Sequence, residues 1–331
     1  MKKTQPDAAS DLARRILDGE RRALAKGITL VESGRAQDRA AAESLMAELL
    51  LHAGKAMRLG LSGAPGVGKS TFIEAFGGYL TDEGLKVAVL AIDPSSSRSG
   101  GSILGDKTRM EELSRDPNAF IRPSPSGGTL GGVARRTREA MLLVEAASFD
   151  VVIVETVGVG QSEVAVADMV DMFCLILAPA GGDELQGIKR GIMELADLII
   201  VNKADGDLEK PARVAAADFK GALGLIRPKF EAWVPEVLMA SALEKRGMAE
   251  VWEAAKRFRL ELAKTGEGDS LRSGQAEAWL RTELREGLME AFQSQKGLAQ
   301  ELEKAEKSVA KGEDLPPAAA AKLLNVFLGE N

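Results

Sequence analysis

The sequence predicts an α/β protein in which a parallel β-sheet carries helices on both faces. Three observations support this fold class. Short apolar runs recur between residues 56 and 242, and segments with helical spacing separate them. These runs are apolar throughout, as expected for strands that are buried on both faces. The residues before and after this region show only the three-to-four spacing of helices, so a helical extension is expected at each end.

The first 55 residues predict the N-terminal helical extension. Apolar residues share helical faces here in two places, at Leu12, Ile16 and Leu17 and again at Leu45, Leu49 and Leu50. Both sets have the spacing of an amphipathic helix that packs on a larger body. The pattern changes to short apolar runs after Gly54.

Residues 56–262 predict the central domain. Six apolar runs are its strand candidates, in chain order "RLGLSG", "KVAVLAID", "DVVIVE", "MFCLILA", "DLIIVNKAD" and "EVLMASA". Helices between successive parallel strands would cover the sheet on both sides.

Residues 263–331 predict a C-terminal helical arm. The stretch "AKTGEGDS" is interpreted as a linker, followed by one long charged helix that ends before Gly312 and a final helix over "AAAAKLLNVFL". The long helix carries an apolar stripe at four-residue spacing, formed by Leu280, Leu284, Leu288 and Phe292. Such a stripe is an unusual exposed patch, so the arm is expected to form a homodimer. The alternative is that the stripe packs on the central domain of its own chain.

Composition restricts the class of protein. The 331 residues carry a net charge of −6, which argues against a general nucleic-acid or anionic-membrane binder. The single cysteine, Cys174, lies in an apolar run and excludes an intramolecular disulfide. We expect a cytoplasmic protein, because the N-terminus has no apolar segment of a signal peptide and no run has membrane-spanning length.

The stretch "GAPGVGKST" follows the first strand and precedes a helix. It matches G-x-x-x-x-G-K-[ST], the P-loop of P-loop NTPases, whose backbone N–H groups surround nucleotide phosphates. Lys69 would reach the β- and γ-phosphates, and the Ser70 hydroxyl would bind Mg²⁺. The expected phosphate-binding residues are Gly63, Ala64, Pro65, Gly66, Val67, Gly68, Lys69, Ser70 and Thr71.

The stretch "NKAD" ends a later strand and predicts guanine selection. The carboxylate of Asp205 can accept hydrogen bonds from guanine N1–H and the 2-amino group, which adenine does not present. The stem of Lys203 would pack on the base. After the last strand, "SAL" would present a backbone N–H to guanine O6. The expected base-binding residues are Asn202, Lys203, Asp205, Ser241, Ala242 and Leu243. The alternative is that Asp205 merely caps a helix.

Acidic residues mark the metal side of the site. Glu155 follows an apolar strand, and the Ser- and Gly-rich loop "DPSSSRSGGSILGDKTRM" contributes Asp93 and Asp106. We expect Mg²⁺ or its waters to bind among Ser70, Asp93, Asp106 and Glu155. Lys69, Asp106 and Glu155 are the candidate catalytic residues. The alternative for Asp93 is that it only caps a turn before Pro94.

The stretch "ETVGVGQSE" predicts slow hydrolysis. Ras-like enzymes carry a water-orienting glutamine after the glycine of this motif, whereas here Val159 follows Gly158. Gln161 lies further along, and the single histidine, His52, lies in the helical extension. The pattern is that of a switch that binds GTP firmly and hydrolyses it slowly until a partner completes the site.

Taken together, these motifs resemble the MeaB/ArgK family of G-proteins over most of the chain. The most specific stretches are "AIDPSSSRSGGSILGDKTRM" and "VETVGVGQSE", supported by "ALAKGITLVES", "GAPGVGKST" and "NKAD". The resemblance implies a SIMIBI-class GTPase fold with a homodimerising C-terminal arm.

The resemblance also implies a function. The chain would be a chaperone of adenosylcobalamin-dependent methylmalonyl-CoA mutase, hydrolysing GTP to GDP to gate cofactor loading and protect the mutase from inactivation. The family's signal-relaying loop matches residues 181–190, which singles out Lys189.

Two other functions compete with this interpretation. One is an NTPase or kinase coupled to basic amino-acid transport, a role once attached to ArgK-like sequences. The other is a metallochaperone of the hydrogenase or urease type, which shares the fold class. Such metallochaperones usually carry Cys/His clusters, and this sequence has one Cys and one His.

Overall fold

The computed structural model describes residues 8–33, 35–93, 110–125, 130–156, 162–179, 190–295 and 297–329. The chain forms two compact units, Met1–Ser273 and Gly274–Asn331, and each is described by itself. The N-terminal helices belong to the same unit as the sheet. The expected boundaries after residues 55 and 262 stay a prediction.

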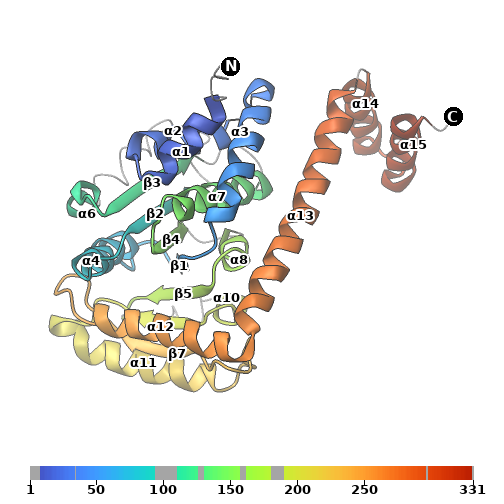
Figure 1. The fold of residues 1–331 in the computed structure, drawn as a ribbon. Coiled ribbons are helices and arrows are strands. Elements are labelled where there is room, and N and C mark those ends of the chain that lie inside the picture. Colours follow the sequence, from blue (N-terminus) through green and yellow to red (C-terminus); the bar gives the residue numbers. More distant parts are fainter. Residues whose placement is uncertain are drawn as a thin grey trace, which may run out of the picture. The chain divides into compact units, whose positions relative to one another are not determined.

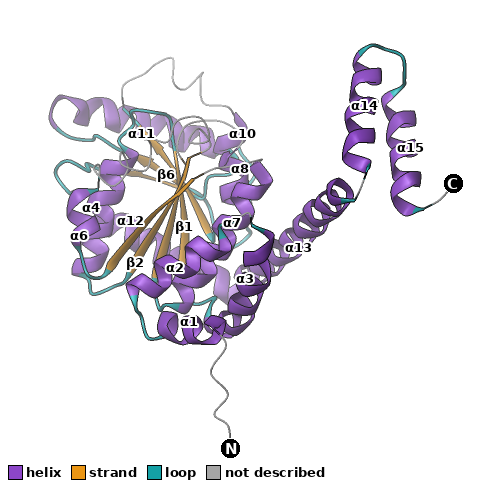
Figure 2. Ribbon diagram, turned by 90° about the horizontal axis from the view of Figure 1, so that it is seen from above, coloured by secondary structure: helices purple, strands orange, loops and turns teal. Residues whose placement is uncertain are grey.

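The first unit is built on a seven-stranded sheet in the order β3-β2-β4-β1-β5-β6-β7, and every neighbouring pair is parallel. Figures 1 and 2 show helices on both of its sides. This confirms the predicted α/β class. The strands are β1 (Met57–Ser62), β2 (Val87–Asp93), β3 (Ala119–Pro125), β4 (Val151–Thr156), β5 (Met172–Leu177), β6 (Leu198–Val201) and β7 (Glu236–Met239).

Strand β3 was not among the six expected strands. Its sequence, "AFIRPSP", contains Pro123 and Pro125, which argue against a central strand because proline cannot donate to a ladder. The structure resolves the conflict by placing β3 at the edge, paired only with β2. An edge strand tolerates proline where the missing N–H would face away from the neighbour.

The two faces of the sheet bury alternate residues of each strand. In β4, Val152 and Val154 belong to one core, whereas Val151 and Ile153 belong to the other. The first core contains residues of α1 (Ala8–Leu17), α2 (Arg21–Val31), α3 (Ala36–Leu49), α7 (Leu130–Ala146), α8 (Ser162–Ala167), α10 (Arg190–Met193) and α11 (Glu209–Leu223). The second contains residues of α4 (Lys69–Asp82), α6 (Glu111–Arg115) and α12 (Met248–Thr265).

The N-terminal extension packs on the first face as its periodicity predicted. Ile16, Leu45 and Leu49 are fully buried, and Gly27 of α2 lies so close to α7 that a Cβ there would come within 2.9 Å of Leu143 Cδ2. Leu50 was wrongly assigned to this face. The helix ends at Leu49, and a 3₁₀ turn over Leu50–His52 turns Leu50 outward.

The expected linker near residue 266 is wrong. Helix α12 ends at Thr265, and α13 (Glu267–Ser294) begins two residues later. Gly266 alone separates them, with φ +76° at the C-terminal end of α12. Glycine reaches this left-handed region readily, so one residue is enough to end a helix and redirect the chain.

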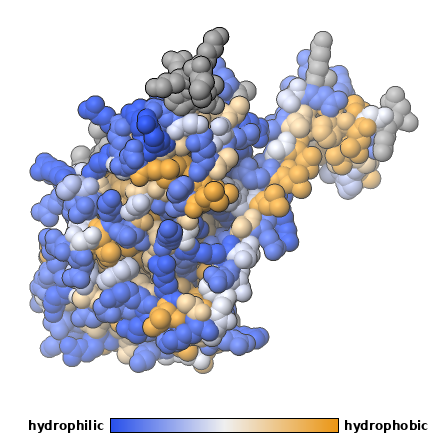
Figure 3. Space-filling view, in the orientation of Figure 1, coloured by the Kyte–Doolittle hydropathy of each residue, from blue (hydrophilic) through white to orange (hydrophobic). Residues whose placement is uncertain are grey.

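Helices α13, α14 and α15 supply the described residues of the second unit. The single long helix expected up to Gly312 is interrupted at Gly297 (φ +92°), so that α13, α14 (Leu298–Ala310) and α15 (Pro316–Leu328) form separate helices. The rings of Phe292 and Phe327 lie 5.4 Å apart, and Phe292 and Leu298 are buried. Figure 3 shows further apolar residues on the surface of these helices. No helix in the described part of the chain could span a membrane.

A charged cluster, formed by Arg58, Glu145, Asp171 and Arg272, lies at the amino edge of the sheet. Arg58 Nε donates to Glu145 Oε1 at 2.6 Å, and the Arg58 amide donates to Asp171 Oδ2 at 2.8 Å. Arg272, near the start of α13, donates to both carboxylate oxygens of Asp171 and to the carbonyl of Gly54. The cluster therefore joins the N-terminal extension, β1, α7 and the first turns of α13.

Candidate nucleotide site

The P-loop lies between β1 and α4 at the carboxyl edge of the sheet. Gly63 passes next to β5, where a Cβ would lie 2.2 Å from the backbone oxygen of Ile176. Gly68, with φ +89°, occupies the N-cap position of α4, and a Cβ there would lie 2.8 Å from Asn202 Nδ2. A larger residue at either position would push the loop away from its neighbours.

Lys69 is buried and lies within the turn of this loop. Its Nζ donates to the backbone oxygens of Gly63 at 2.7 Å and Ala64 at 3.2 Å. Helix α4 starts beside it with a bond from the Phe72 amide to the Gly68 oxygen at 2.8 Å. A cation at a helix N-terminus, surrounded by inward-turned backbone, is the arrangement that binds nucleotide phosphates.

Glu155 and Ser70 meet at the ends of β4 and α4. Glu155 is buried near the end of β4, and Ser70 Oγ lies 3.4 Å from its Oε1. The next residue, Thr156, donates to the Ser62 hydroxyl at 2.9 Å, which ties β4 to β1 just before the P-loop. The structure thus brings together two of the four expected metal-side residues. Asp106, Lys189 and the side chain of Asp93 lie outside the described residues.

The donor set fits Mg²⁺. Serine hydroxyl and glutamate carboxylate are hard oxygen ligands, and Mg²⁺ in nucleotide sites typically takes only one or two of them, with phosphates and waters for the rest. Within the described residues, no group of three or more His, Cys, Asp or Glu side chains could hold a metal ion. A two-ligand site of the Ser70–Glu155 kind does not require such a group.

Asn202 connects the two halves of the site. Its buried side chain donates from Nδ2 to the backbone oxygen of Val67 at 3.0 Å, and its Oδ1 accepts from the Ala242 amide at 3.1 Å. One side chain therefore fixes the P-loop to the loop that follows β7. The sequence reasoning assigned Asn202 to the base site but did not foresee this double contact, which joins residues far apart in the chain.

The expected base-binding residues come together beside this bond. Lys203 has φ +58° and donates from Nζ to the Gly66 oxygen at 2.6 Å. Asp205 accepts a hydrogen bond from the Ser241 hydroxyl, although it lies at the N-cap position of the 3₁₀ helix η2 (Gly206–Leu208). The position matches the alternative assignment of Asp205 as a helix cap, but its side chain makes no capping hydrogen bond there.

The loop after β7 is closed by a residue that the sequence reasoning missed. Ser241 and Arg246 exchange two backbone hydrogen bonds of 3.0 Å, and Arg246 Nη2 donates to the Ala204 oxygen at 2.8 Å. Lys245 has φ +54° within this turn. Nothing local in "SALEKRG" marks Arg246, because its acceptor lies 42 residues earlier.

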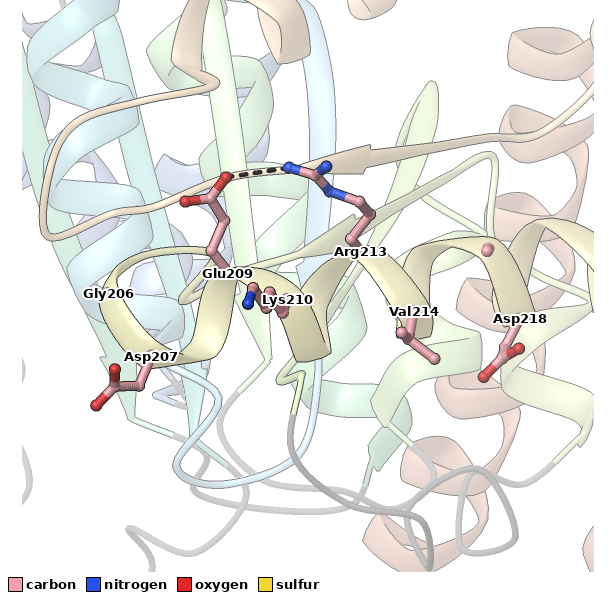
Figure 4. A pocket seen from close by; sticks show the side chains of 8 residues that line it. Gly206, Asp207, Glu209, Lys210, Arg213, Val214 and Asp218 are labelled. Carbon is pink, nitrogen blue, oxygen red and sulfur yellow. Dashed lines mark hydrogen bonds and ion pairs between the residues drawn. The ribbon is translucent and has the colours of Figure 1, made fainter.

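A surface hollow of about 690 Å³ lies beside the site, on η2 and α11. Its lining includes Asp207 and the ion pair between Glu209 and Arg213 at 3.2 Å (Figure 4). None of the expected nucleotide-binding residues lines it. The hollow is therefore a feature of the outer helix surface and not the nucleotide site.

Cys174 and His52 take no part in the site. Burial raises the pKa of the Cys174 thiol, so this residue stays a protonated core side chain, as its apolar neighbours predicted. His52 is exposed on the 3₁₀ turn of the N-terminal extension.

The chain is similar to one family model, two relatives and one solved structure. The model of the family described as methylmalonyl-CoA mutase-associated GTPase MeaB matches residues 24–297. A putative GTPase of Caulobacter vibrioides is 53% identical over 316 residues, or 96% of this chain and 97% of the relative. The mitochondrial methylmalonic aciduria type A homolog of Mus musculus is 47% identical over 343 residues, which cover 98% of this chain and 83% of the relative. A crystal structure of an LAO/AO transport system kinase has a TM-score of 0.78 and 39% identity, covering 99% of this chain and 100% of that one.

Proposed function

Because the chain belongs to the family of methylmalonyl-CoA mutase-associated GTPases, we propose that it hydrolyses GTP to GDP as a chaperone of an adenosylcobalamin-dependent methylmalonyl-CoA mutase. GTP hydrolysis would gate cofactor loading and protect the mutase from inactivation. The observation that carries the nucleotide part is the double contact of Asn202, which joins the P-loop to the loop that follows β7. The mutase part is supported by the family and by the methylmalonic aciduria relative.

Phosphate binding is the role of Lys69 and the start of α4. The Lys69 ammonium would exchange its two carbonyl partners for phosphate oxygens, and the loop amides would surround the charge. Ser70 and Glu155, together with Asp93 and Asp106, would hold Mg²⁺ or its waters. A metal ion held by these residues would supply positive charge against the negative charge that develops on the phosphate during hydrolysis.

Base selection is the role of Asp205 and the loop after β7. The Asp205 carboxylate would accept the two guanine donors in place of the Ser241 hydroxyl. Within "SAL", the amides of Ser241 and Ala242 already donate to Arg246 and Asn202. This leaves the amide of the exposed residue Leu243 as the donor that we assign to guanine O6.

Slow turnover without a partner follows from the sequence of the switch stretch. Val159 cannot orient a water molecule, so we expect a rate well below the roughly 1–10³ s⁻¹ of ordinary enzymes. The mutase would accelerate hydrolysis by completing the site, with Lys189 relaying the signal.

A cytoplasmic location is proposed as well. The single cysteine is buried and free, which fits a reducing compartment.

The arm supports a homodimer. Leu280, Leu284 and Leu288 are 69%, 62% and 53% exposed in the single chain. Burying such side chains against a second copy would stabilise it by roughly 1.5–3 kcal/mol each. Sedimentation of the full-length Leu284→Glu variant tests this, because a charge in an apolar interface should give monomers. A Leu284→Glu protein that still sediments as a dimer would show that the interface lies elsewhere.

Single-turnover hydrolysis of GTP, with and without a purified adenosylcobalamin-dependent mutase, tests the whole proposal. We expect slow hydrolysis by the isolated protein, acceleration by the mutase, and loss of most of that acceleration in Lys189→Ala with unchanged basal hydrolysis. Fast hydrolysis by the isolated protein, or indifference to every such mutase, would favour the transport-coupled alternative, in line with the solved relative that is named an LAO/AO transport system kinase.

A further inference from the structure

The turn over residues 241–246 presents the amide that we assign to guanine O6. Ser241 and Arg246 exchange two backbone hydrogen bonds of 3.0 Å, which close the turn at its two ends. Within the turn, the Glu244 amide donates to the Ser241 hydroxyl at 3.0 Å. The Leu243 amide has no acceptor among the described residues, and Leu243 is 79% exposed. The turn therefore leaves this amide available to a ligand.

The start of the turn is fixed to the loop that follows β6. The Ala204 amide donates to the Ala240 oxygen at 3.0 Å, and the Ser241 hydroxyl donates to Asp205. In the proposed complex, guanine takes the Asp205 carboxylate from this hydroxyl, so the second contact is lost when the base binds. The first contact and the bond from Asn202 remain, and both lie at the start of the turn.

Arg246 supplies a contact at the far end of the turn. Its Nη2 donates at 2.8 Å to the backbone oxygen of Ala204, the residue directly before Asp205. Its Nε lies 2.8 Å from Glu244 Oε2, so the guanidinium also binds within the turn. The Ala204 oxygen is not an atom that we assign to the base. The bond from Arg246 can therefore persist when guanine is bound.

Gly247 holds the same end of the turn against β7. It has φ +85°, and a Cβ there would lie 2.6 Å from the Met239 oxygen and 3.0 Å from Ala240 Cα. Only glycine allows so close an approach in this left-handed conformation. The far end of the turn is thus held on two sides, by the end of β7 and, through Arg246, by the loop that carries Asp205.

Guanine presents O6, N1–H and the 2-amino group along one rigid edge. A protein that reads all three needs the Asp205 carboxylate and the Leu243 amide at a fixed separation. Resting on the proposed GTPase function, but not on its mutase partner, we propose that Arg246 is a positioning residue for guanine selection. By binding the Ala204 oxygen from the far end of the turn, it sets where the Leu243 amide lies relative to Asp205.

Nucleotides that differ at one group of the base test this proposal in the full-length protein. Isothermal titration compares GDP with 6-thio-GDP, which keeps N1–H and the 2-amino group but replaces O6 with sulfur, a weaker acceptor. Arg246→Ala should weaken GDP binding by roughly fivefold and 6-thio-GDP binding by less than about twofold. The preference for GDP over IDP, which lacks the 2-amino group read by Asp205, should stay within about twofold of that of the wild type.

Glu244→Gln is the matched control. It removes the ion pair with Arg246 but keeps the bond from Arg246 to Ala204 and the backbone amide that donates to Ser241. This control should leave the affinities for GDP, 6-thio-GDP and IDP unchanged.

Hydrogen exchange followed by NMR supplies a readout that needs no nucleotide. The Ser241 amide donates to the Arg246 oxygen, so it should exchange roughly threefold faster in Arg246→Ala than in wild type. Glu244→Gln should show the wild-type rate, because it leaves the guanidinium on the Ala204 oxygen.

Gly247→Ala disturbs the same end of the turn from the other side, because its methyl group would press on the Met239 oxygen while the Arg246 side chain is intact. It should also lower the preference for GDP over 6-thio-GDP, and it decides the matter if Arg246→Ala does not fold. Equal weakening of GDP and 6-thio-GDP in Arg246→Ala, or no change in either, would overturn the proposal. A wild type that binds no guanine nucleotide would instead overturn the proposed function.

Discussion

The two edges of the same sheet use polar side chains in opposite ways. At the amino edge, the charged cluster consists of acids and bases that bind each other, and the Glu145 side chain is completely buried. At the carboxyl edge, Lys203 is held by a backbone oxygen and Asp205 by a hydroxyl. Opposite charges that are paired and desolvated are hard to separate, whereas carbonyl and hydroxyl partners can be exchanged for those of a ligand.

The difference shows how a similar set of side chains can serve stability or binding. The amino edge joins segments that are far apart in the chain, and its charges are already used by one another. At the carboxyl edge, Lys203 and Asp205 have neutral hydrogen-bond partners, which a bound nucleotide would replace. If this division is real, substitutions at the amino edge should change stability, and those at the carboxyl edge should change binding.

The largest effect is expected at the amino edge. Glu145→Ala leaves the Arg58 guanidinium, 13% exposed, without its carboxylate, and breaking such a buried pair lowers the free energy of unfolding by roughly 3–5 kcal/mol. Urea denaturation measures this. The control is Glu253→Ala, which breaks an exposed pair with Lys256 and should change stability by less than about 1 kcal/mol. A change in nucleotide affinity of the folded Glu145→Ala protein would contradict the division between the edges.

Lys69→Ala should give the next largest effect, now on function. Removing the ammonium from the loop leaves the phosphate charge without its partner, and single-turnover hydrolysis should fall by roughly 10²–10³-fold. Thermal unfolding of the nucleotide-free variant should stay close to that of the wild type. Near-normal hydrolysis would remove Lys69 from the catalytic assignment.

Asp205→Asn should alter specificity with a smaller change in free energy. An amide in place of the carboxylate presents a donor, which suits the 2-oxo group of xanthosine and opposes the 2-amino group of guanosine. Competition between GTP and XTP should shift toward XTP by roughly tenfold or more. Retained preference for GTP would mean that Asp205 does not contact the base.

The smallest effect is expected on the pH dependence of stability and concerns Asp197, a buried acid just before β6. Burial raises the pKa of Asp197 to about 6, although Lys229 at 3.9 Å and the Phe173 amide at 2.8 Å oppose the shift. The folded state therefore holds the proton more tightly than the unfolded state. Stability from this group is full below about pH 4 and is lost as the pH rises to about 6.

Asp197→Asn removes this dependence. Above about pH 6 the variant should be more stable than the wild type, and below about pH 4 the two should be similar. Urea denaturation across this pH range measures the difference. A constant difference between the two proteins at every pH would show that Asp197 does not titrate in this way.

The sequence alone was sufficient to locate candidate site residues that belong to one continuous motif. "GAPGVGKST" and "NKAD" identified the loop of Lys69 and the position of Asp205, and the family model confirms the resemblance that these motifs suggested. Strands buried on both faces were readable because each apolar run is short and uninterrupted. The roles of Asp93, Asp106 and Lys189 stay predictions.

The features that the sequence did not predict are of two kinds. Some are contacts between residues far apart in the chain, and others depend on the conformation or position of a single residue. The Arg58–Glu145 pair joins residues 87 positions apart, and Arg272 reaches back 218 positions to Gly54, so no local pattern marks either. Strand β3 was hidden by its prolines, which only an edge position permits. Gly266 resembled part of a linker, although it merely separates two helices.

The double contact of Asn202 makes the nucleotide site separable for engineering. Asn202 fixes the loop after β7 to the P-loop through its side-chain amide nitrogen and oxygen, and neither contact involves Asp205. Asp205, the residue proposed to read the base, can therefore be exchanged while the P-loop keeps the support of Asn202. An Asp205→Asn copy in a cell would respond to added xanthosine nucleotide while unmodified GTPases ignored it. Such a variant could therefore be controlled by nucleotide addition without affecting the other GTPases of the cell.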